Sequence, residues 1–343
     1  MTAHNGHALP LALDRARELA VPALRAAIGR LAPSLKLVAA YHLGWVDADG
    51  HPSDGSGGKA IRPALALLSA EAAGAGAREG LPGAVAVQLV HDFSLLHDDL
   101  MDGDEERRHR PTAWKAFGPA LAVLTGDALL ALASQVLFEV PGERAAAAAR
   151  HLAAATDLLI LGQAQDLSFE HRMDVTLDEC LAMTANKTGA LLACSASIGA
   201  VLAGAPPATV EHLHAFGLHL GLAFQAVDDL LGIWGDPQVT GKPVFSDLRS
   251  RKKTLPLTYA LAQDGPAARE LGGWLSRPAQ TTTEDGLHRI AELIDAAGGR
   301  EWATAEARRR ITAAEQALAG AAIPAQPREE LAAIAHFIIA REA

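Results

Sequence analysis

The sequence is poor in cysteine, which argues against several kinds of site. Cys180 and Cys194 are the only two, and neither stands at metal-ligand spacing from a histidine or from the other cysteine. A thiolate metal site is therefore not expected. So low a cysteine content is typical of a reducing compartment, and we expect a cytoplasmic protein.

Positive charge is also scarce. Lys plus Arg total 30 against 40 for Asp plus Glu, which gives a formal net charge of -10. General nucleic-acid binding needs a basic surface, so no nucleic-acid partner is expected. Acidic residues can instead be gathered to hold a cation, so their clustering matters more than their sum.

Signals for export or membrane insertion are missing as well. The N-terminus lacks the basic start and apolar run of a secretory signal. Residues 188–210 carry no charge and are long enough to span a bilayer. They are mostly Ala, Gly and Ser, however, with Pro206 and Pro207 near the end. This composition favours a buried helix of a bundle, so we expect no transmembrane segment.

Alternating β-branched runs are absent, and apolar residues recur at helical spacing almost throughout. Half of the residues are hydrophobic, enough for a large core. We find no fixed-period repeat and no strong linker. The prediction is an all-α fold, with one helical domain over residues 11–343 after a frayed N-terminus at 1–10. The predicted helices are 11–31, 35–46, 60–75, 80–104, 117–139, 143–169, 176–204, 208–233, 254–263, 283–298, 300–319 and 326–341.

One acidic cluster ends an apolar helical run. Asp98 and Asp102 are four residues apart, so on a helix they share a face with Cβ atoms about 6 Å apart. Asp99 lies beside them on the helical wheel. Three carboxylates within one turn repel each other unless a cation lies between them, and hard oxygen ligands without cysteine favour Mg²⁺. A solvated acidic patch is the alternative, but the apolar flanks favour a polar cavity.

A second acidic pair, Asp228 and Asp229, also ends an apolar helical run. The two clusters are far apart in the chain, so they could come from facing helices of a bundle, where metal sites are common. Two such motifs are much less expected by chance than one.

Several basic residues stand in short segments beside Gly, Pro or Asp. Lys59 and Arg62 follow a Gly-rich loop at a predicted helix start, a setting that suits an anion. Arg107 and Arg108 follow the first acidic cluster, and the planar guanidinium suits diphosphate oxygens. Each alone could be a solvated surface charge, but together they indicate a phosphate-rich ligand bridged by metal. The remaining candidates are Lys187 with Thr188, Lys242 and Lys252.

The ordered series of motifs resembles the trans-isoprenyl diphosphate synthases, the polyprenyl synthetase family, and among them bacterial geranylgeranyl diphosphate synthases. The resemblance runs from about Gly57 to Arg341. Its parts are Gly-Gly-Lys-x-x-Arg-Pro at 57–63, the DDxxD motif at 98–102 with Arg107-Arg108, Gly126-Asp127, Gly162-Gln163-x-x-Asp166, Lys187-Thr188, Phe224-Gln225 with Asp228-Asp229, Gly241-Lys242, and Asp247-Leu248 with Lys252. Each part is weak alone, and the series is specific.

The resemblance implies a single large bundle of long helices around a deep central cavity, usually a homodimer. It implies Mg²⁺-dependent, head-to-tail condensation of isopentenyl diphosphate with an allylic diphosphate. Three Mg²⁺ ions are implied, two held by Asp98 and Asp102 and the third by Asp228, with Asp99 in the same catalytic group. The implied contacts to the allylic diphosphate are Arg107, Lys187, Thr188, Gln225, Lys242 and Lys252, and those to isopentenyl diphosphate are Lys59, Arg62, His91 and Arg108.

Two positions depart from the family pattern. Ala60 replaces an Arg common after the Lys of the first motif, which removes a positive charge near the implied isopentenyl site. Gly232 replaces the third aspartate of the second DDxxD and would share the helical face of Asp228. Asp236 is near that face if the helix continues, although Gly235 opposes continuation. The third metal is still expected, because Asp228 is retained.

Product length is expected to depend on Phe93 and Ser94, about one turn before the first acidic motif. The resemblance implies that an aromatic residue with a small neighbour there limits the product to twenty carbons. Three alternatives stay open besides geranylgeranyl diphosphate: a farnesyl diphosphate synthase, a class I terpene cyclase on the same fold, and a non-catalytic subunit of a partner synthase. The isopentenyl residues argue against the cyclase, and the intact first cluster argues against the non-catalytic subunit.

Overall fold

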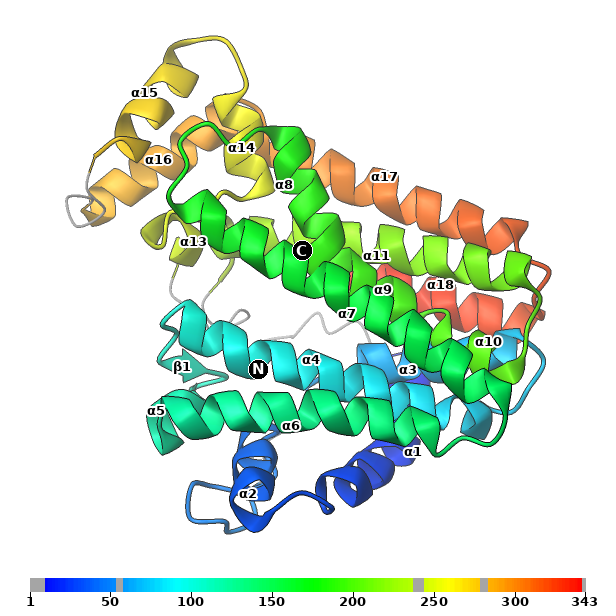
Figure 1. The fold of residues 1–343 in the computed structure, drawn as a ribbon. Helices are drawn as coiled ribbons and strands as arrows, with labels where there is room; N and C mark the ends of the chain where they lie inside the picture. Colours follow the sequence, from blue (N-terminus) through cyan, green and yellow to red (C-terminus); the bar gives the residue numbers. More distant parts are fainter. Residues whose placement is uncertain (1–9, 54–57, 237–243, 278–282, 341–343) are drawn as a thin grey trace, which may run out of the picture. The chain divides into compact units, whose positions relative to one another are not determined.

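The computed structural model describes residues 10–53, 58–236, 244–277 and 283–340. Over these ranges the regular structure is helical apart from a two-stranded hairpin, so the all-α prediction is confirmed (Figure 1). The longer helices are α1 (Leu11–Ile28), α2 (Pro33–His42), α3 (Ile61–Ala72), α4 (Leu81–Met101), α6 (Pro119–Phe138), α7 (Glu143–Glu170), α11 (Pro207–Trp234), α15 (Pro266–Leu275), α16 (Glu284–Ala296), α17 (Gly299–Gly320) and α18 (Ala325–Ile339). The shorter elements are η1 (Ala77–Gly80), β1 (Glu106–Arg107), β2 (Arg110–Pro111), α5 (Ala113–Phe117), α8 (Leu177–Thr184), η2 (Ala185–Gly189), α9 (Ala190–Ser195), α10 (Ile198–Ala203), α13 (Ser246–Arg249) and α14 (Leu255–Leu261).

The chain divides into two compact units. The first comprises Met1–Thr156, Leu191–Gly217 and Ala317–Ile334, and the second comprises Asp157–Ala190, Leu218–Gln316 and Ala335–Ala343. Each unit is made of segments that are distant in the sequence. The single domain around a central cavity therefore stays a prediction.

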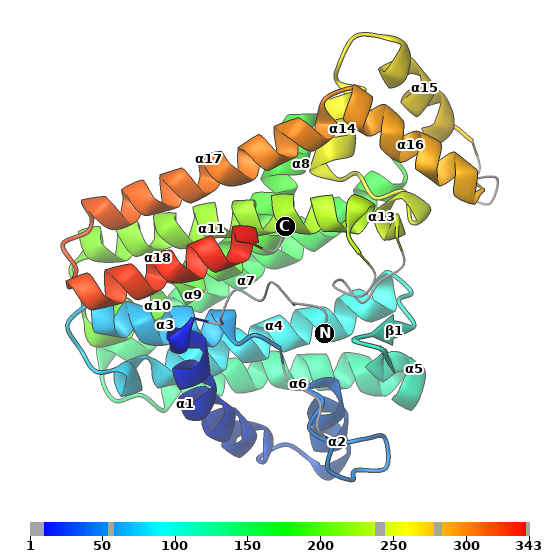
Figure 2. The same cartoon turned by 180° about the vertical axis from the view of Figure 1, so that it is seen from behind.

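In the first unit, α4 and α6 run side by side, and α3 packs against both α4 and α10 (Figures 1 and 2). Small residues allow this close approach. A Cβ atom on Gly199 of α10 would lie 2.0 Å from the backbone oxygen of Ala66 in α3, and one on Gly83 of α4 would lie 2.9 Å from Ile198. The Ala- and Gly-rich stretch with no charge therefore includes a buried helix.

Within the described ranges, three helices are long and apolar enough to cross a membrane by length and composition. These helices are α6, α7 and α11. In each, part of an apolar 18-residue stretch is buried inside the protein: 39% in α6, 39% in α7 and 61% in α11. The stretch at 188–210, singled out from the sequence, is not among them.

The second unit has a core to which α11, α14, α15 and α16 contribute. Leu257 of α14, Leu271 and Trp274 of α15 and Ile294 of α16 are buried together with Ile233 of α11. The sequence analysis missed α15, whose interior contains two adjacent glycines, poor helix formers. Packing of its apolar side against α14 and α16 outweighs that cost.

The helix predicted over 176–204 is wrong as a continuous element. It begins at Leu177 with a capping box between Thr176 and Glu179, then passes through a π-helical turn at η2 and breaks before α10. At the break, the hydroxyl of Ser197 donates to the carbonyl of Ala193 at 2.7 Å, and φ of Ser197 is -129°. Such side-chain bonds compete with regular helix hydrogen bonding.

The same serine joins a histidine pair in the first unit. Because the Ser197 hydroxyl donates to Ala193, it accepts from Nε2 of His151 at 2.7 Å. The ring of His214 lies 5.8 Å from that of His151. Burial, with His214 as a smaller cause, lowers the pKa of His151 to about 4.

This histidine should make the fold sensitive to acid. The pKa of His151 in the folded protein lies below the unfolded value of 6.5. The stability that depends on the neutral ring is therefore complete above pH 6.5 and is lost as the pH drops toward 4. We expect the loss to reach about 3 kcal/mol. His151→Gln keeps an N–H donor without a titrating ring. Urea unfolding of parent and variant between pH 7 and pH 4 should show a smaller decline for the variant, and equal declines would contradict this assignment.

Candidate active site

The first acidic cluster lies where α4 ends, and its three carboxylates have different surroundings. Asp98 is in the last turn and Asp102 follows Met101 with nearly helical backbone angles, and both are partly exposed. Asp99 is only 1% exposed. Its Oδ1 accepts from Nε of Arg107 at 2.7 Å and forms an ion pair with Nη2 at 2.6 Å. Burial raises the pKa of the Asp99 carboxyl, and Arg107 opposes that shift.

Arg107 stands on a hairpin that the sequence analysis missed. Strands β1 and β2 pair antiparallel and are joined by Arg108 and His109, whose φ values are 54° and 60°. A two-residue turn of this kind usually contains Asn or Gly, so the sequence carried no typical signal. The hydroxyl of Tyr41 donates to the carbonyl of Pro111 at 2.8 Å and ties the hairpin to α2.

Two predicted isopentenyl ligands, Arg62 and His91, meet between α3 and α4. Nη1 of Arg62 lies 3.4 Å from Nε2 of His91. Burial and the nearby Arg62 lower the pKa of His91 well below its ordinary value, so the ring is neutral. Burial lowers the pKa of Arg62 to about 10, which leaves the guanidinium charged at neutral pH.

The glycine-rich loop leads into the same region. Gly58 has φ of +87°, and a Cβ atom there would lie 3.2 Å from Nη2 of Arg108. Lys59 follows and is exposed, and Ala60 has φ of 55° at the start of α3. Glycine at 58 thus gives Arg108 room beside the loop. Among the first unit's predicted anion ligands, Arg62 and Arg107 are partly buried, whereas Arg108 is exposed.

A buried group beside His91 was not predicted from the sequence. Asp92 accepts from Nε2 of Gln88 at 3.0 Å through both oxygens, and its Oδ1 lies 3.9 Å from Nε2 of His42. Burial raises the pKa of Asp92 to about 7 and lowers that of His42 to about 3. A cavity of about 300 Å³ lies next to this group, lined by residues that include His42, Asp99, Arg107 and Arg108.

The second unit contains the other group of predicted site residues. Nζ of Lys187 is 2.6 Å from Oδ2 of Asp166 on α7. Lys187 lies in the π-helical turn η2, a distortion often found at functional sites. A Cβ atom on Gly162 would lie 2.3 Å from the backbone nitrogen of Lys187, so glycine is needed for α7 to pass this turn.

A chain of hydrogen bonds links three segments of this unit. Thr188 donates to Oε1 of Gln225 at 2.8 Å, and Nε2 of Gln225 donates to Oδ1 of Asp229 at 2.8 Å. The other oxygen of Asp229 accepts from the backbone nitrogen of Leu255 at 2.8 Å and so caps α14. Asp229 is 5% exposed, whereas Asp228 is exposed. The buried aspartate therefore holds the site together and leaves its neighbour facing outward.

Three other predicted residues lie in α4 or just before α14. Lys252 is partly buried just before α14, next to Lys253, whose carbonyl accepts from Sγ of Cys180 at 3.0 Å. Phe93 is 6% exposed and lies edge-on to His97, with ring centroids 4.9 Å apart. Ser94 is buried and donates to the carbonyl of His91 at 2.9 Å. Lys242 lies outside the described residues.

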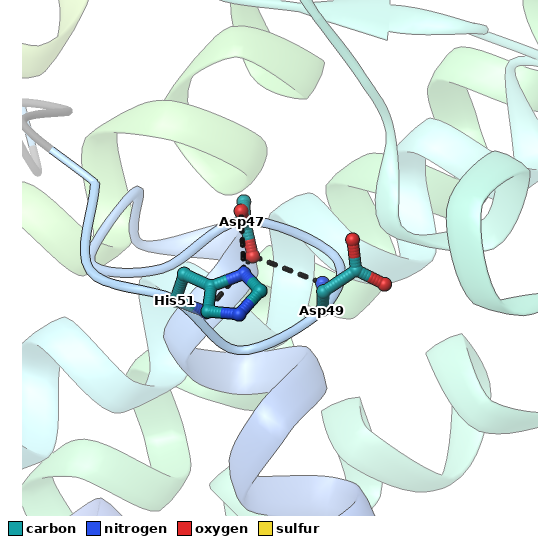
Figure 3. Close-up of side chains that lie close together, drawn as sticks. All are labelled: Asp47, Asp49 and His51. Atoms are coloured by element: carbon teal, nitrogen blue, oxygen red, sulfur yellow. Dashed lines mark hydrogen bonds and ion pairs between the residues drawn. The ribbon is translucent and has the colours of Figure 1, made fainter.

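The donor chemistry of both clusters fits Mg²⁺, because each offers outward carboxylates without thiolates and has basic groups nearby. A third group of possible ligands lies elsewhere. Asp47, Asp49 and His51 bring ligand atoms within 4.8 Å of one another (Figure 3). Oδ1 of Asp47 accepts from the backbone nitrogens of Asp49 and His51 at 3.0 and 2.9 Å. These bonds are those of a self-capped surface turn, so the cluster needs no ion to explain it.

Known proteins resemble this chain over most of its length. A family model described as polyprenyl synthetase matches residues 52–294. The chain belongs to the polyprenyl synthetase family. It is 54% identical over 333 residues to a (2E,6E)-farnesyl diphosphate synthase of Mycobacterium tuberculosis, covering 96% of this chain and 93% of that protein. It is 46% identical over 307 residues to a geranylgeranyl diphosphate synthase of the same species, covering 89% and 87%.

A solved relative shares the fold closely. The crystal structure of a polyprenyl synthetase from Streptomyces coelicolor A3(2) matches with a TM-score of 0.93 and 57% identity, covering 96% of this chain and 99% of that one. The family resemblance inferred from the motifs is thus confirmed, and this family member is a trans-prenyltransferase that makes prenyl diphosphates. The family normally uses Mg²⁺.

The two neighbouring aspartates of the first cluster should respond differently to removal. Asp99→Ala leaves Arg107 without its buried partner, and we expect a loss of about 2–3 kcal/mol of stability, since Arg107 is partly solvated. Asp98→Ala removes a carboxylate from a crowded acidic turn and should change stability by less than about 1 kcal/mol. Denaturant unfolding in EDTA measures both. Equal losses of stability in the two variants would show that Asp99 contributes no more to stability than Asp98.

Proposed function

We propose that this enzyme condenses isopentenyl diphosphate head-to-tail with an allylic diphosphate and that its main product is farnesyl diphosphate. The observation that carries the reaction is the end of α4, where Asp98 and Asp102 stand beside an arginine hairpin held by the buried Asp99. The higher identity to a farnesyl than to a geranylgeranyl synthase supports the fifteen-carbon product.

Three Mg²⁺ ions are proposed, with Asp98 and Asp102 as ligands of two and Asp228 as a ligand of the third. When bound, they neutralise the allylic diphosphate so that it can leave. Arg107 and Lys187 add fixed positive charge, and each is oriented by a carboxylate, Asp99 and Asp166 respectively. Thr188, Gln225, Lys242 and Lys252 are the remaining proposed contacts of that diphosphate.

Isopentenyl diphosphate is proposed to bind through Lys59, Arg62, His91 and Arg108. Arg62 stays charged and can bind diphosphate oxygens, while neutral His91 contributes a hydrogen bond rather than a charge. After the allylic carbon–oxygen bond breaks, the isopentenyl double bond attacks the cation and a proton leaves, with the released diphosphate as the proposed acceptor. Water would quench the cation, so the mechanism requires that water be kept away from it.

Geranylgeranyl diphosphate is the second candidate product. Phe93 is buried and its ring is fixed against His97 of the same helix, and the next residue, Ser94, is small. An aromatic residue with a small neighbour there is the pattern from which the twenty-carbon product was predicted. We propose Phe93 as part of the floor for the growing tail, a role that rests on the family resemblance; a parent that stops at fifteen carbons would mean that the floor lies elsewhere.

A cytoplasmic homodimer is the proposed form. Both cysteines are buried and unpaired, which suits a reducing compartment. Helix α6 leaves Leu124 and Phe138 54% and 64% exposed, with Val123 beside them. Exposed large apolar side chains can mark a subunit interface, and a second copy of the chain is the proposed partner.

Loss of a metal ligand should remove activity while the fold persists. Asp98→Ala and Asp102→Ala should each lower turnover by about a hundredfold or more, and EDTA should abolish it until Mg²⁺ is restored. Incorporation of labelled isopentenyl diphosphate into an allylic primer measures this. Glu105→Ala, which removes only an exposed ion pair with Lys115, is the matched control. Full activity in EDTA would refute the metal mechanism.

Shortening the proposed floor should lengthen the product. Phe93→Ala opens space beneath the tail, so the main product should gain at least one five-carbon unit, and Phe93→Leu should give a smaller shift with less loss of stability. Chromatography of dephosphorylated products gives the chain lengths of parent and variants. Ser94→Ala keeps the volume and should keep the product. An unchanged distribution in both Phe93 variants would place the floor elsewhere.

A further inference from the structure

The turn that ends α13 leads directly into Lys252, a proposed contact of the allylic diphosphate. The backbone nitrogen of Arg251 donates to the carbonyl of Leu248 at 3.2 Å. The backbone nitrogen of Lys252 donates to the carbonyl of Asp247 at 2.9 Å. These two bonds form a Schellman motif, the usual way to close a helix, with Arg251 just after the cap residue. The backbone of Lys252 is therefore placed by the geometry of this turn.

Arg251 occupies the position of that motif where glycine is usual. Its φ is 54°, in the left-handed region. A Cβ atom crowds the backbone in this conformation, whereas glycine adopts it freely. An arginine persists here only where the contacts of its side chain fix it, so those contacts matter.

The side chain of Arg251 joins the turn to the end of α15. Nη1 donates to the carbonyl of Leu275 at 3.1 Å and also to the carbonyl of Arg277. Cζ lies 5.0 Å from the ring centroid of Trp274, close enough for a cation–π contact. The last carbonyls of a helix lack partners within it and carry partial negative charge. The guanidinium therefore caps α15, and we call this set of contacts the arginine clamp.

Helix α15 is a firm support for the arginine clamp. Trp274 and Leu275 are each only 6% exposed, and they belong to the core of the second unit. That core also contains Leu257 of α14 and Ile294 of α16. The turn before Lys252 is thus tied to a packed core rather than to a surface loop.

The chain just after Lys252 is fixed by other contacts. The carbonyl of Lys253 accepts from Sγ of Cys180 at 3.0 Å. The backbone nitrogen of Leu255 donates to Oδ2 of Asp229 at 2.8 Å. Lys252 therefore stands between two anchors, and loss of the arginine clamp would release one of them.

We propose that Arg251 is a positioning residue for Lys252: the arginine clamp fixes the backbone from which Lys252 binds the allylic diphosphate. This inference rests on the proposed contact between Lys252 and that diphosphate. It gives α15, which carries none of the sequence motifs, a part in the binding of the allylic substrate.

The test separates the arginine clamp from the fold of the turn. Arg251→Gly suits the left-handed backbone and keeps the Schellman hydrogen bonds, but it removes the side chain. Arg251→Lys keeps a cation and is the conservative variant. Arg289→Ala is the matched control, because it removes a different arginine contact of α15, the exposed pair with Glu270 at 3.1 Å. Initial rates are measured with the allylic diphosphate and isopentenyl diphosphate varied in turn.

Arg251→Gly should raise KM for the allylic diphosphate by about threefold to tenfold, the range that corresponds to ordering one long side chain on binding. KM for isopentenyl diphosphate should stay unchanged. Arg251→Lys should give a smaller rise, and Arg289→Ala should match the parent. Circular dichroism shows that each variant is folded, and either replacement at 251 carries the comparison alone.

A double-mutant cycle decides whether Arg251 acts through its neighbour. In a Lys252→Ala background, Arg251→Gly should cause no further rise in the allylic KM, whereas independent effects would add. A merely structural role would lower the melting temperature and leave the allylic KM of Arg251→Gly at the parent value.

Two results would overturn the inference: a parent-like allylic KM in both variants at 251, or an equal rise with and without the Lys252 side chain. Failure of the underlying contact looks different. Lys252→Ala would then leave the allylic KM unchanged, and Arg251 would have no contact to position. Failure of the proposed reaction would appear in the parent, which would not condense isopentenyl diphosphate at all.

Discussion

The ion pair between Asp99 and Arg107 is the contact on which the first unit's group of site residues depends. Its carboxylate is almost fully buried, so removing either partner would leave an uncompensated charge. The pair anchors a hairpin whose turn has two residues with positive φ, and that turn carries Arg108. Burial raises the pKa of the Asp99 carboxyl, and Arg107 lowers it against the upward effect of the nearby Asp104 and Asp102.

The second cluster follows the same division of labour. In each Asp-Asp pair, one carboxylate is buried and builds the site while its neighbour is directed outward. Asp229 accepts from Gln225 and from the backbone of Leu255, so one side chain aligns α11 with the start of α14. Asp228 is exposed beside it. Adjacent carboxylates can thus serve in one motif because successive positions on a helix point in different directions.

Much of this was predictable from local sequence. Helical periodicity predicted most helices to within a few residues, and the ordered motifs predicted the family. The hairpin was missed because Arg108 and His109 are not typical turn residues, and the break before α10 because the role of Ser197 depends on its bond to His151. The sequence could not predict that Asp92 lies beside His42 or that Asp247 lies against Gly232. Both contacts form only when separate segments pack together.

Backbone strain is concentrated in the same segments. Among the described residues, the non-glycine positions with positive φ are Ala60, Arg108, His109, Phe245 and Arg251. Each is in, or next to, a segment that carries a predicted diphosphate contact or Asp247. Such conformations cost about 1–3 kcal/mol each and persist only where neighbouring contacts fix them. The ion pair at Asp99, the Tyr41 bond to the hairpin and the packing of Phe245 on His288 are contacts of that kind. Part of the stability of the helical core is therefore used to hold charged side chains in place before any diphosphate binds, which is the arrangement that electrostatic catalysis requires.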